Sequence, residues 1–78
     1  MHEEEAAVQR VVQRLREIRV ERSISLYRLA KDSGLSPSGL RHMENGDVTP
    51  TLAFLLRVAR FLEADLSAIL NETIIDDA

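Results

Sequence analysis

Residues 25–46 read SLYRLAKDSGLSPSGLRHMENG, and this stretch constrains the fold more than any other part of the chain. Its first half has the composition of a short helix that ends at Gly34, because glycine readily adopts the left-handed conformation that closes a helix. Ser36, followed by a proline, has the residue type preferred at a helix N-cap. The spacing predicts two short helices, at 26–33 and 37–44, joined by a tight turn.

Small and apolar residues within this stretch indicate how the two helices pack. Ala30 lies where they would cross, and a larger side chain there would push them apart. Leu40 and Met43 recur three residues apart, which places one apolar stripe on the second helix. This arrangement is that of a helix-turn-helix, a motif that presents its second helix to the major groove of DNA.

The remainder of the chain predicts three further helices and no strand. Residues 4–21 carry an apolar face with helical spacing: Val8, Val11, Val12, Leu15 and Ile18. Residues 51–63 carry a broader apolar face: Leu52, Leu55, Leu56, Val58, Ala59 and Leu62. Asp65 caps a short last helix, whose inward-facing residues are Leu66, Ile69 and Leu70.

Composition limits the chemistry that this chain can perform. Its 78 residues suffice for one small all-α domain of five helices, with a core over 6–71 and flexible or extended ends at 1–5 and 72–78. The absence of cysteine excludes disulfides and thiolate metal sites. No apolar run approaches the roughly 20 residues of a membrane span, and no signal peptide is visible, so a cytoplasmic protein is expected.

The formal net charge of −3 is unevenly distributed. Six of the 13 acidic residues lie at the two ends: Glu3, Glu4, Glu5, Glu72, Asp76 and Asp77. Without those six, the 10 basic residues give the interior a balance of +3. Such a distribution is compatible with DNA binding, because the local field matters more than total charge. It is equally compatible with charged ends that only keep a small protein soluble.

From Val12 to Leu70 the sequence resembles the lambda-repressor/Cro-type helix-turn-helix family. Several segments carry this resemblance at consistent separations: LREIR, SLYRLAKDSGLS, MENG, TPTL and LEADLSAIL. It implies a five-helix, lambda-repressor-like fold and a homodimer that binds double-stranded DNA at a palindromic operator without a cofactor. Small stand-alone members of the family include phage repressors, restriction–modification controllers and antitoxins. A transcriptional regulator, repressor-like in action, is therefore the first functional hypothesis.

The resemblance also implies that residues 37–44 enter the major groove. Arg41 is the expected base reader, since a guanidinium can bond two acceptors of guanine at once. Ser38 and His42 can contact a base or a phosphate, and His42 can instead be only a solvated surface residue. Pro37 is expected to make close backbone or methylene contact rather than hydrogen-bonded readout.

Phosphate contacts are expected at helix ends, where free N–H groups favour an anion. Ser25 and Ser36 precede the two short helices and can serve as caps, as phosphate ligands or as both. The backbone around Asn45 and Gly46 is a phosphate clamp in related proteins. Arg28 is a further phosphate candidate, although it can also simply cover its own helix.

An ion pair between Arg19 and Glu44 is implied by the resemblance. In the family, an arginine near the end of the first helix pairs with the glutamate of the MENG-like segment. Such a pair would tie the first helix to the recognition helix. Its effect on DNA binding would be architectural and indirect.

The chain departs from the family pattern at several contact positions. Leu26 stands where a phosphate-binding glutamine is frequent, and Asp47 stands where lysine or arginine is frequent. Pro37 and Gly39 replace longer polar side chains. These differences predict fewer direct contacts per subunit, so that affinity would depend on dimerisation or on DNA shape.

Phe54 and Phe61 are seven residues apart and are expected on one side of their helix. They can form a partner surface, or they can belong to the core of a small domain. The candidate residues for a dimer interface are Phe54, Phe61, Ile69, Leu70, Ile74 and Ile75.

A protein-interaction module and an enzyme are the two other functional classes to consider for this sequence. The fold could instead serve as a protein-interaction module, antitoxin-like or a regulatory partner, with weak DNA binding. Net acidity, Leu26 and Asp47 favour this second hypothesis. An enzyme is not expected, because His42 and Glu44 do not face each other on a helix. The sequence also contains no glycine-rich phosphate loop and no metal-ligand cluster.

Overall fold

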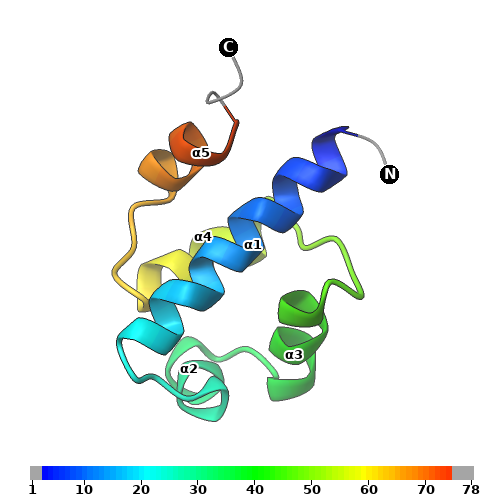
Figure 1. Cartoon of the computed structure of the whole chain (residues 1–78). Coiled ribbons are helices and arrows are strands. Elements are labelled where there is room, and N and C mark those ends of the chain that lie inside the picture. The colour runs from blue at the N-terminus through cyan, green and yellow to red at the C-terminus, as the bar shows by residue number, and fades with distance from the viewer. Residues whose placement is uncertain (1–2, 75–78) are drawn as a thin grey trace.

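The computed structural model describes residues 3–74, which form five helices and contain no strand (Figure 1). The helices are α1 (Glu3–Glu21), α2 (Leu26–Ser33), α3 (Pro37–Asn45), α4 (Leu52–Phe61) and α5 (Leu66–Ile74). The expected all-α architecture of five helices is therefore confirmed for these residues.

The outer helices extend further than the sequence predicted. α1 begins at Glu3 and α5 ends at Ile74, so both helices enter the segments expected to be flexible or extended. Three glutamates in the first turn of α1 suit the positive end of the helix dipole and favour an early start. Residues 1–2 and 75–78 lie outside the described residues.

α4 is shorter than expected because its first predicted residue acts as a cap. Thr51 precedes the helix, and its hydroxyl accepts a hydrogen bond from the Phe54 backbone N–H at 3.1 Å. The helix ends at Phe61, and Glu63 beyond it adopts a left-handed backbone with φ of 54°. Leu62 thus serves as the C-cap rather than as a helical residue.

The described helices pack around α1. In the view of Figure 1, α2 and α3 lie on one side of α1 and α5 lies on the other, while α4 passes behind it. α1 contacts α3, α4 and α5, and α2 contacts α3 and α4. The resulting apolar core comprises Val11, Val12, Leu15, Ile18, Leu29, Ala30, Leu40, Met43, Leu55, Val58, Ala59, Leu62, Leu66 and Ile69.

The apolar face of α4 is narrower than the sequence suggested. Leu52 is 64% exposed and Leu56 is 52% exposed, although both were expected to belong to the apolar face of this helix. Leu52 and Leu56 are four residues apart and therefore lie on the same face of the helix. This exposed stripe runs beside a buried one that contains Leu55 and Val58. A helix of ten residues buries only the stripe that faces α1 and α2, so the flanking leucines remain in solvent.

Two valines in different helices provide a matched test of this core. Val58→Ala, at a site 1% exposed, should lower the free energy of unfolding by about 2 kcal/mol, because it removes buried methyl groups and leaves a cavity. Val20→Ala, at a site 55% exposed, should change it by less than about 0.5 kcal/mol. Urea denaturation measures both, and equal effects would contradict this core assignment.

Candidate nucleic-acid interface

The α2–turn–α3 unit begins each helix with a serine cap. Ser25 Oγ accepts from the Arg28 N–H at 3.0 Å, and Ser36 Oγ accepts from the Gly39 N–H at 2.9 Å. Gly34 closes α2 in the left-handed conformation, with φ of 74°. This φ value strains any residue that has a Cβ atom, which explains why glycine ends α2.

α3 is held by its buried side and leaves its other side in solvent. Leu40 and Met43 are buried against the core, and Ala30 is buried where α2 and α3 approach. The opposite side of α3 exposes four polar side chains: Ser38, Arg41, His42 and Asn45. Three of the expected base-contacting residues, Ser38, Arg41 and His42, therefore lie together on one accessible helical surface, whereas Pro37 is half-buried.

Arg41 is not a free surface side chain in this arrangement. Its Nη2 donates a hydrogen bond of 2.8 Å to the hydroxyl oxygen of Tyr27, in the first turn of α2. Its guanidinium carbon also lies 5.6 Å from the centroid of the Tyr27 ring, a cation–π distance. Sequence reasoning missed Tyr27 as part of this surface. The available signal was an aromatic residue with a polar tip near the start of the first motif helix.

His42 lies next to an acidic residue of the following loop. Its Nδ1 is 3.2 Å from Asp47 Oδ2, and both side chains are more than half exposed. Asp47 therefore places negative charge beside the end of α3, where a basic residue is frequent in related sequences. The exposed His42 ring can stay in contact with Asp47, or it can rotate towards a ligand.

Pro37 and Gly39 serve the start of α3. Both are half-buried, and Pro37 occupies the first turn of the helix, where no N–H partner is needed. A Cβ atom on Gly39 would lie 2.8 Å from Ser36 Oγ, so the Ser36 hydroxyl would have to shift to admit a larger residue. Arg28 occupies the equivalent position after the Ser25 cap of α2, so a side chain at this position is compatible with a serine cap.

A left-handed glycine closes α3. Gly46 has φ of 79°, and its N–H donates to the Met43 carbonyl at 3.1 Å. A Cβ atom at this position would lie 3.3 Å from Gln9 Oε1 of α1. Asn45 is exposed beside it, so the expected phosphate-contacting residues at the end of α3 are accessible.

The other expected phosphate contacts differ in their present partners. Ser25 and Ser36 are exposed, and both hydroxyls act as caps. Arg28 is exposed, and its Nε lies 3.7 Å from Asp32 Oδ2 one turn later on α2. This exposed pair is weak enough for Arg28 to exchange its partner for a phosphate.

Arg19 and Glu44, expected to pair, form a nearly enclosed bidentate contact. Arg19 Nε donates to Glu44 Oε2 at 2.7 Å and Nη2 donates to Oε1 at 2.9 Å. The third nitrogen, Nη1, donates to the Ile24 carbonyl at 2.8 Å. The side chains of Arg19 and Glu44 are only 12% and 6% exposed. This pair ties α1 to α3 and to the connection before α2.

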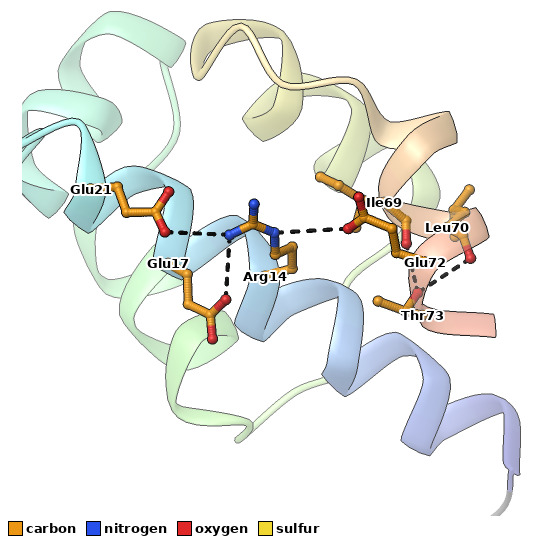
Figure 2. Close-up of polar contacts among 7 residues, drawn as sticks. All are labelled: Arg14, Glu17, Glu21, Ile69, Leu70, Glu72 and Thr73. Atoms are coloured by element: carbon orange, nitrogen blue, oxygen red, sulfur yellow. Dashed lines mark hydrogen bonds and ion pairs between the residues drawn. The ribbon is translucent and has the colours of Figure 1, made fainter. Parts of the chain in front are cut away.

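A second polar cluster joins α1 to α5 (Figure 2). Arg14 Nη1 lies 3.4 Å from Glu17 and 3.5 Å from Glu21, and its Nε lies 4.0 Å from Glu72 of α5. Arg10 Nε donates to the Thr73 carbonyl at 3.1 Å. These contacts are exposed, so they contribute little to stability, and α5 is held on α1 mainly by its buried residues Leu66 and Ile69.

The expected dimer residues have unequal exposure. Ile69 is buried within its own core, which contradicts its expected place in an interface. Phe54 is half-buried against the core and lines an apolar hollow beside α3, while Leu70 is also half-buried. Phe61 remains 39% exposed. The Ile74 side chain and all of Ile75 lie outside what the structure describes.

Phe54 and Phe61 do not form the shared aromatic face that their spacing suggested. Phe54 faces the α3 side of α4, whereas Phe61 lies at the end of α4 near Leu56. The most exposed large apolar residues of α4 are instead Leu52 and Leu56, which the sequence placed on the broad apolar face of this helix.

The described residues offer no site for a metal ion, since no group of three or more potential ligands comes together among them. None of the helices between residues 3 and 74 is long and apolar enough to cross a membrane.

The comparisons with known proteins agree with the geometry of α2 and α3. A helix-turn-helix family model matches residues 15–69, and the chain belongs to the lambda-repressor/Cro-type helix-turn-helix family. The family consists of DNA-binding regulators, so the α2–turn–α3 unit is a DNA-binding motif. No curated protein and no solved structure gives a significant match to the chain.

Removal of one partner of the Arg19–Glu44 pair should destabilise the fold strongly. Glu44→Ala leaves the enclosed Arg19 charge uncompensated and should lower the free energy of unfolding by about 3 kcal/mol. Glu17→Ala, which removes an exposed partner of Arg14, should change it by less than about 0.5 kcal/mol.

Urea denaturation measures both variants. The double variant Arg19→Met, Glu44→Leu should recover much of the loss, because no enclosed charge remains unpaired. Arg16 Nε, which lies 3.6 Å from Glu44, belongs to a side chain that is 47% exposed and can be solvated by water. Equal, small effects of Glu44→Ala and Glu17→Ala would contradict a structural role for the pair.

Proposed function

We propose that this protein is a homodimeric, sequence-specific regulator of transcription that acts as a repressor on a palindromic operator in the cytoplasm. The observation that carries the proposal is the surface of α3. Its buried side is fixed by Leu40 and Met43, while Ser38 and Arg41 project from the exposed side of the same helix. A rigid helix with exposed donors suits the major groove, where base edges present distinct acceptors.

The distribution of charge supports this use of α3. The acidic first turn of α1 lies at the end of that helix remote from α2, as Figure 1 shows. Arg41, Arg28 and Lys31 are exposed on the two helices of the DNA-binding motif. Phosphate contacts by such groups release counterions, so affinity should fall as the salt concentration rises.

A second candidate function is a protein-interaction module built on the same fold. Asp47 places an acidic group beside His42. Leu26 packs against the core at a position where the family pattern often has a phosphate-binding side chain. Both features weaken the contacts available to DNA. This alternative predicts that the α3 surface is covered by a protein partner and that DNA binding is weak even at low salt.

Selection from random duplex DNA at low salt separates these functions. The wild type should enrich a palindrome with half-sites about one helical turn apart. Arg41→Ala should relax preference at particular base pairs, by about 1–3 kcal/mol if the arginine contacts guanine through two donors. Arg22→Ala, which removes an exposed arginine beyond the end of α1, should leave the selected motif unchanged.

Two results would count against the proposal in different ways. A wild type that enriches no motif would favour the interaction module. A motif that Arg41→Ala leaves intact would keep DNA binding but remove Arg41 from base readout.

The exposed stripe of α4 is the proposed dimer surface. Leu52 and Leu56 lie on one face of the helix, and Leu56 and Phe61 line a common shallow depression with Arg57 and Arg60. Arg60 lies over the Phe61 ring at 5.9 Å, which gives the apolar patch a basic rim. Apolar patches rimmed by polar residues are typical of protein–protein contacts.

Charge introduced into this stripe should separate the dimer. Leu56→Glu should raise the dimer dissociation constant at least about tenfold, because a buried carboxylate would face an apolar partner surface. Val20→Glu, an exposed apolar position on α1, is the matched control and should leave the constant unchanged. Sedimentation equilibrium measures both, and an unchanged dimer for Leu56→Glu would place the interface elsewhere.

A further inference from the structure

We propose that Tyr27 is a positioning residue for sequence recognition, which orients the Arg41 guanidinium for its base contact. The inference rests on the proposed function, in which Arg41 reads a base. It extends the readout surface from α3 to α2 and assigns a role to a side chain that the helix-turn-helix pattern alone does not explain.

Two contacts between the same pair of side chains connect α2 to α3. The Tyr27 hydroxyl accepts a hydrogen bond of 2.8 Å from Arg41 Nη2, and the guanidinium carbon lies 5.6 Å from the ring centroid. The hydrogen bond orients one end of the guanidinium plane, and the adjacent ring limits the rotamers of the arginine. The contact therefore favours one direction of the group over the many that are open to a free arginine.

This restraint matters because Arg41 is otherwise exposed on α3. A long arginine side chain has many rotamers in solvent and loses this freedom when it docks on a base. A side chain that is already held in one arrangement loses less on binding. The benefit is larger for a bidentate contact, which requires a defined orientation of the guanidinium plane.

The remaining hydrogen-bonding capacity of both groups suits DNA. Arginine has five N–H donors, and the contact with Tyr27 uses one of them, so donors remain for guanine acceptors. A tyrosine hydroxyl that accepts a hydrogen bond still has its own proton to donate. A phosphate oxygen is a suitable acceptor for that proton, which would connect backbone contact and base readout through one hydroxyl.

The packing of Tyr27 argues against a purely structural role. Its side chain is 61% exposed and is not among the residues packed against the core. Since the ring buries little apolar surface, the hydroxyl is the only part of the Tyr27 side chain with a hydrogen-bond partner among the described residues. Phenylalanine at this position would keep the ring contact and lose only the hydrogen bond.

A double-mutant cycle on a selected operator tests the inference. The wild type, Tyr27→Phe, Arg41→Ala and the double variant are compared for binding to the operator and to a copy altered at the base pair that Arg41→Ala affects. Tyr27→Phe should lower discrimination between these two DNAs by about 3- to 10-fold, the range expected for one hydrogen bond. In the Arg41→Ala background, Tyr27→Phe should have no effect on discrimination.

Two further readouts separate positioning from stability. The melting temperature of Tyr27→Phe should match that of the wild type, because the side chain is exposed. In the free protein, NMR signals of the Arg41 guanidinium should broaden or shift in Tyr27→Phe, and those of Arg57, which donates to the Ser33 carbonyl, should stay unchanged. A structural role would not move the Arg41 signals selectively.

The outcomes distinguish this inference from the proposed function. A wild type that selects no motif would overturn both. A motif that depends on Arg41 but keeps its full base discrimination in Tyr27→Phe would overturn the positioning role alone. A uniform loss of affinity for both DNAs, with a smaller salt dependence, would also overturn it and would make Tyr27 a phosphate contact.

Discussion

The arrangement of the DNA-binding motif depends on the enclosed contact between Arg19 and Glu44. One guanidinium binds the carboxylate of α3 through two nitrogens and the Ile24 carbonyl through the third. It therefore connects the end of α1, the α1–α2 connection just before α2, and the end of the recognition helix. Apolar packing can bring helices together in several registers, whereas a bidentate ion pair satisfies its hydrogen bonds in only one. The pair thus selects an orientation of α3 more than it adds stability.

Much of the fold could be predicted because local signals and tertiary packing agree. Ser25, Gly34 and Ser36 mark helix ends by their own chemistry, and the structure has α2 and α3 beginning at the predicted residues. The buried face of α1 follows the predicted spacing of apolar residues. The Arg19–Glu44 contact was accessible only through the family resemblance, since the two residues are 25 positions apart.

The parts that could not be predicted depend on where helices end and on which neighbours cover them. Leu52 and Leu56 have the hydrophobicity of core residues, but no described helix covers their stripe. Ile69 has the same character and is buried, because α5 turns that side towards the core. The contact between Tyr27 and Arg41 requires two side chains on different helices to converge, which periodicity along one helix does not reveal. Base contacts depend on the shape and sequence of the DNA as well as on α3, so the packing of the helices does not determine them.

The caps of the two motif helices bear on how the DNA specificity of this domain could evolve. In α2, the Ser25 hydroxyl binds the N–H of Arg28, so a long side chain at the third helical position coexists with a serine cap. Gly39 occupies the same position in α3, and the nearest atom to a Cβ there belongs to the Ser36 side chain, which can move. A substitution at position 39 can therefore be accommodated without loss of the helix start. Ser38 is exposed and its side chain takes no part in the cap, so the first turn of the recognition helix leaves both positions open to the evolution of new operator sequences.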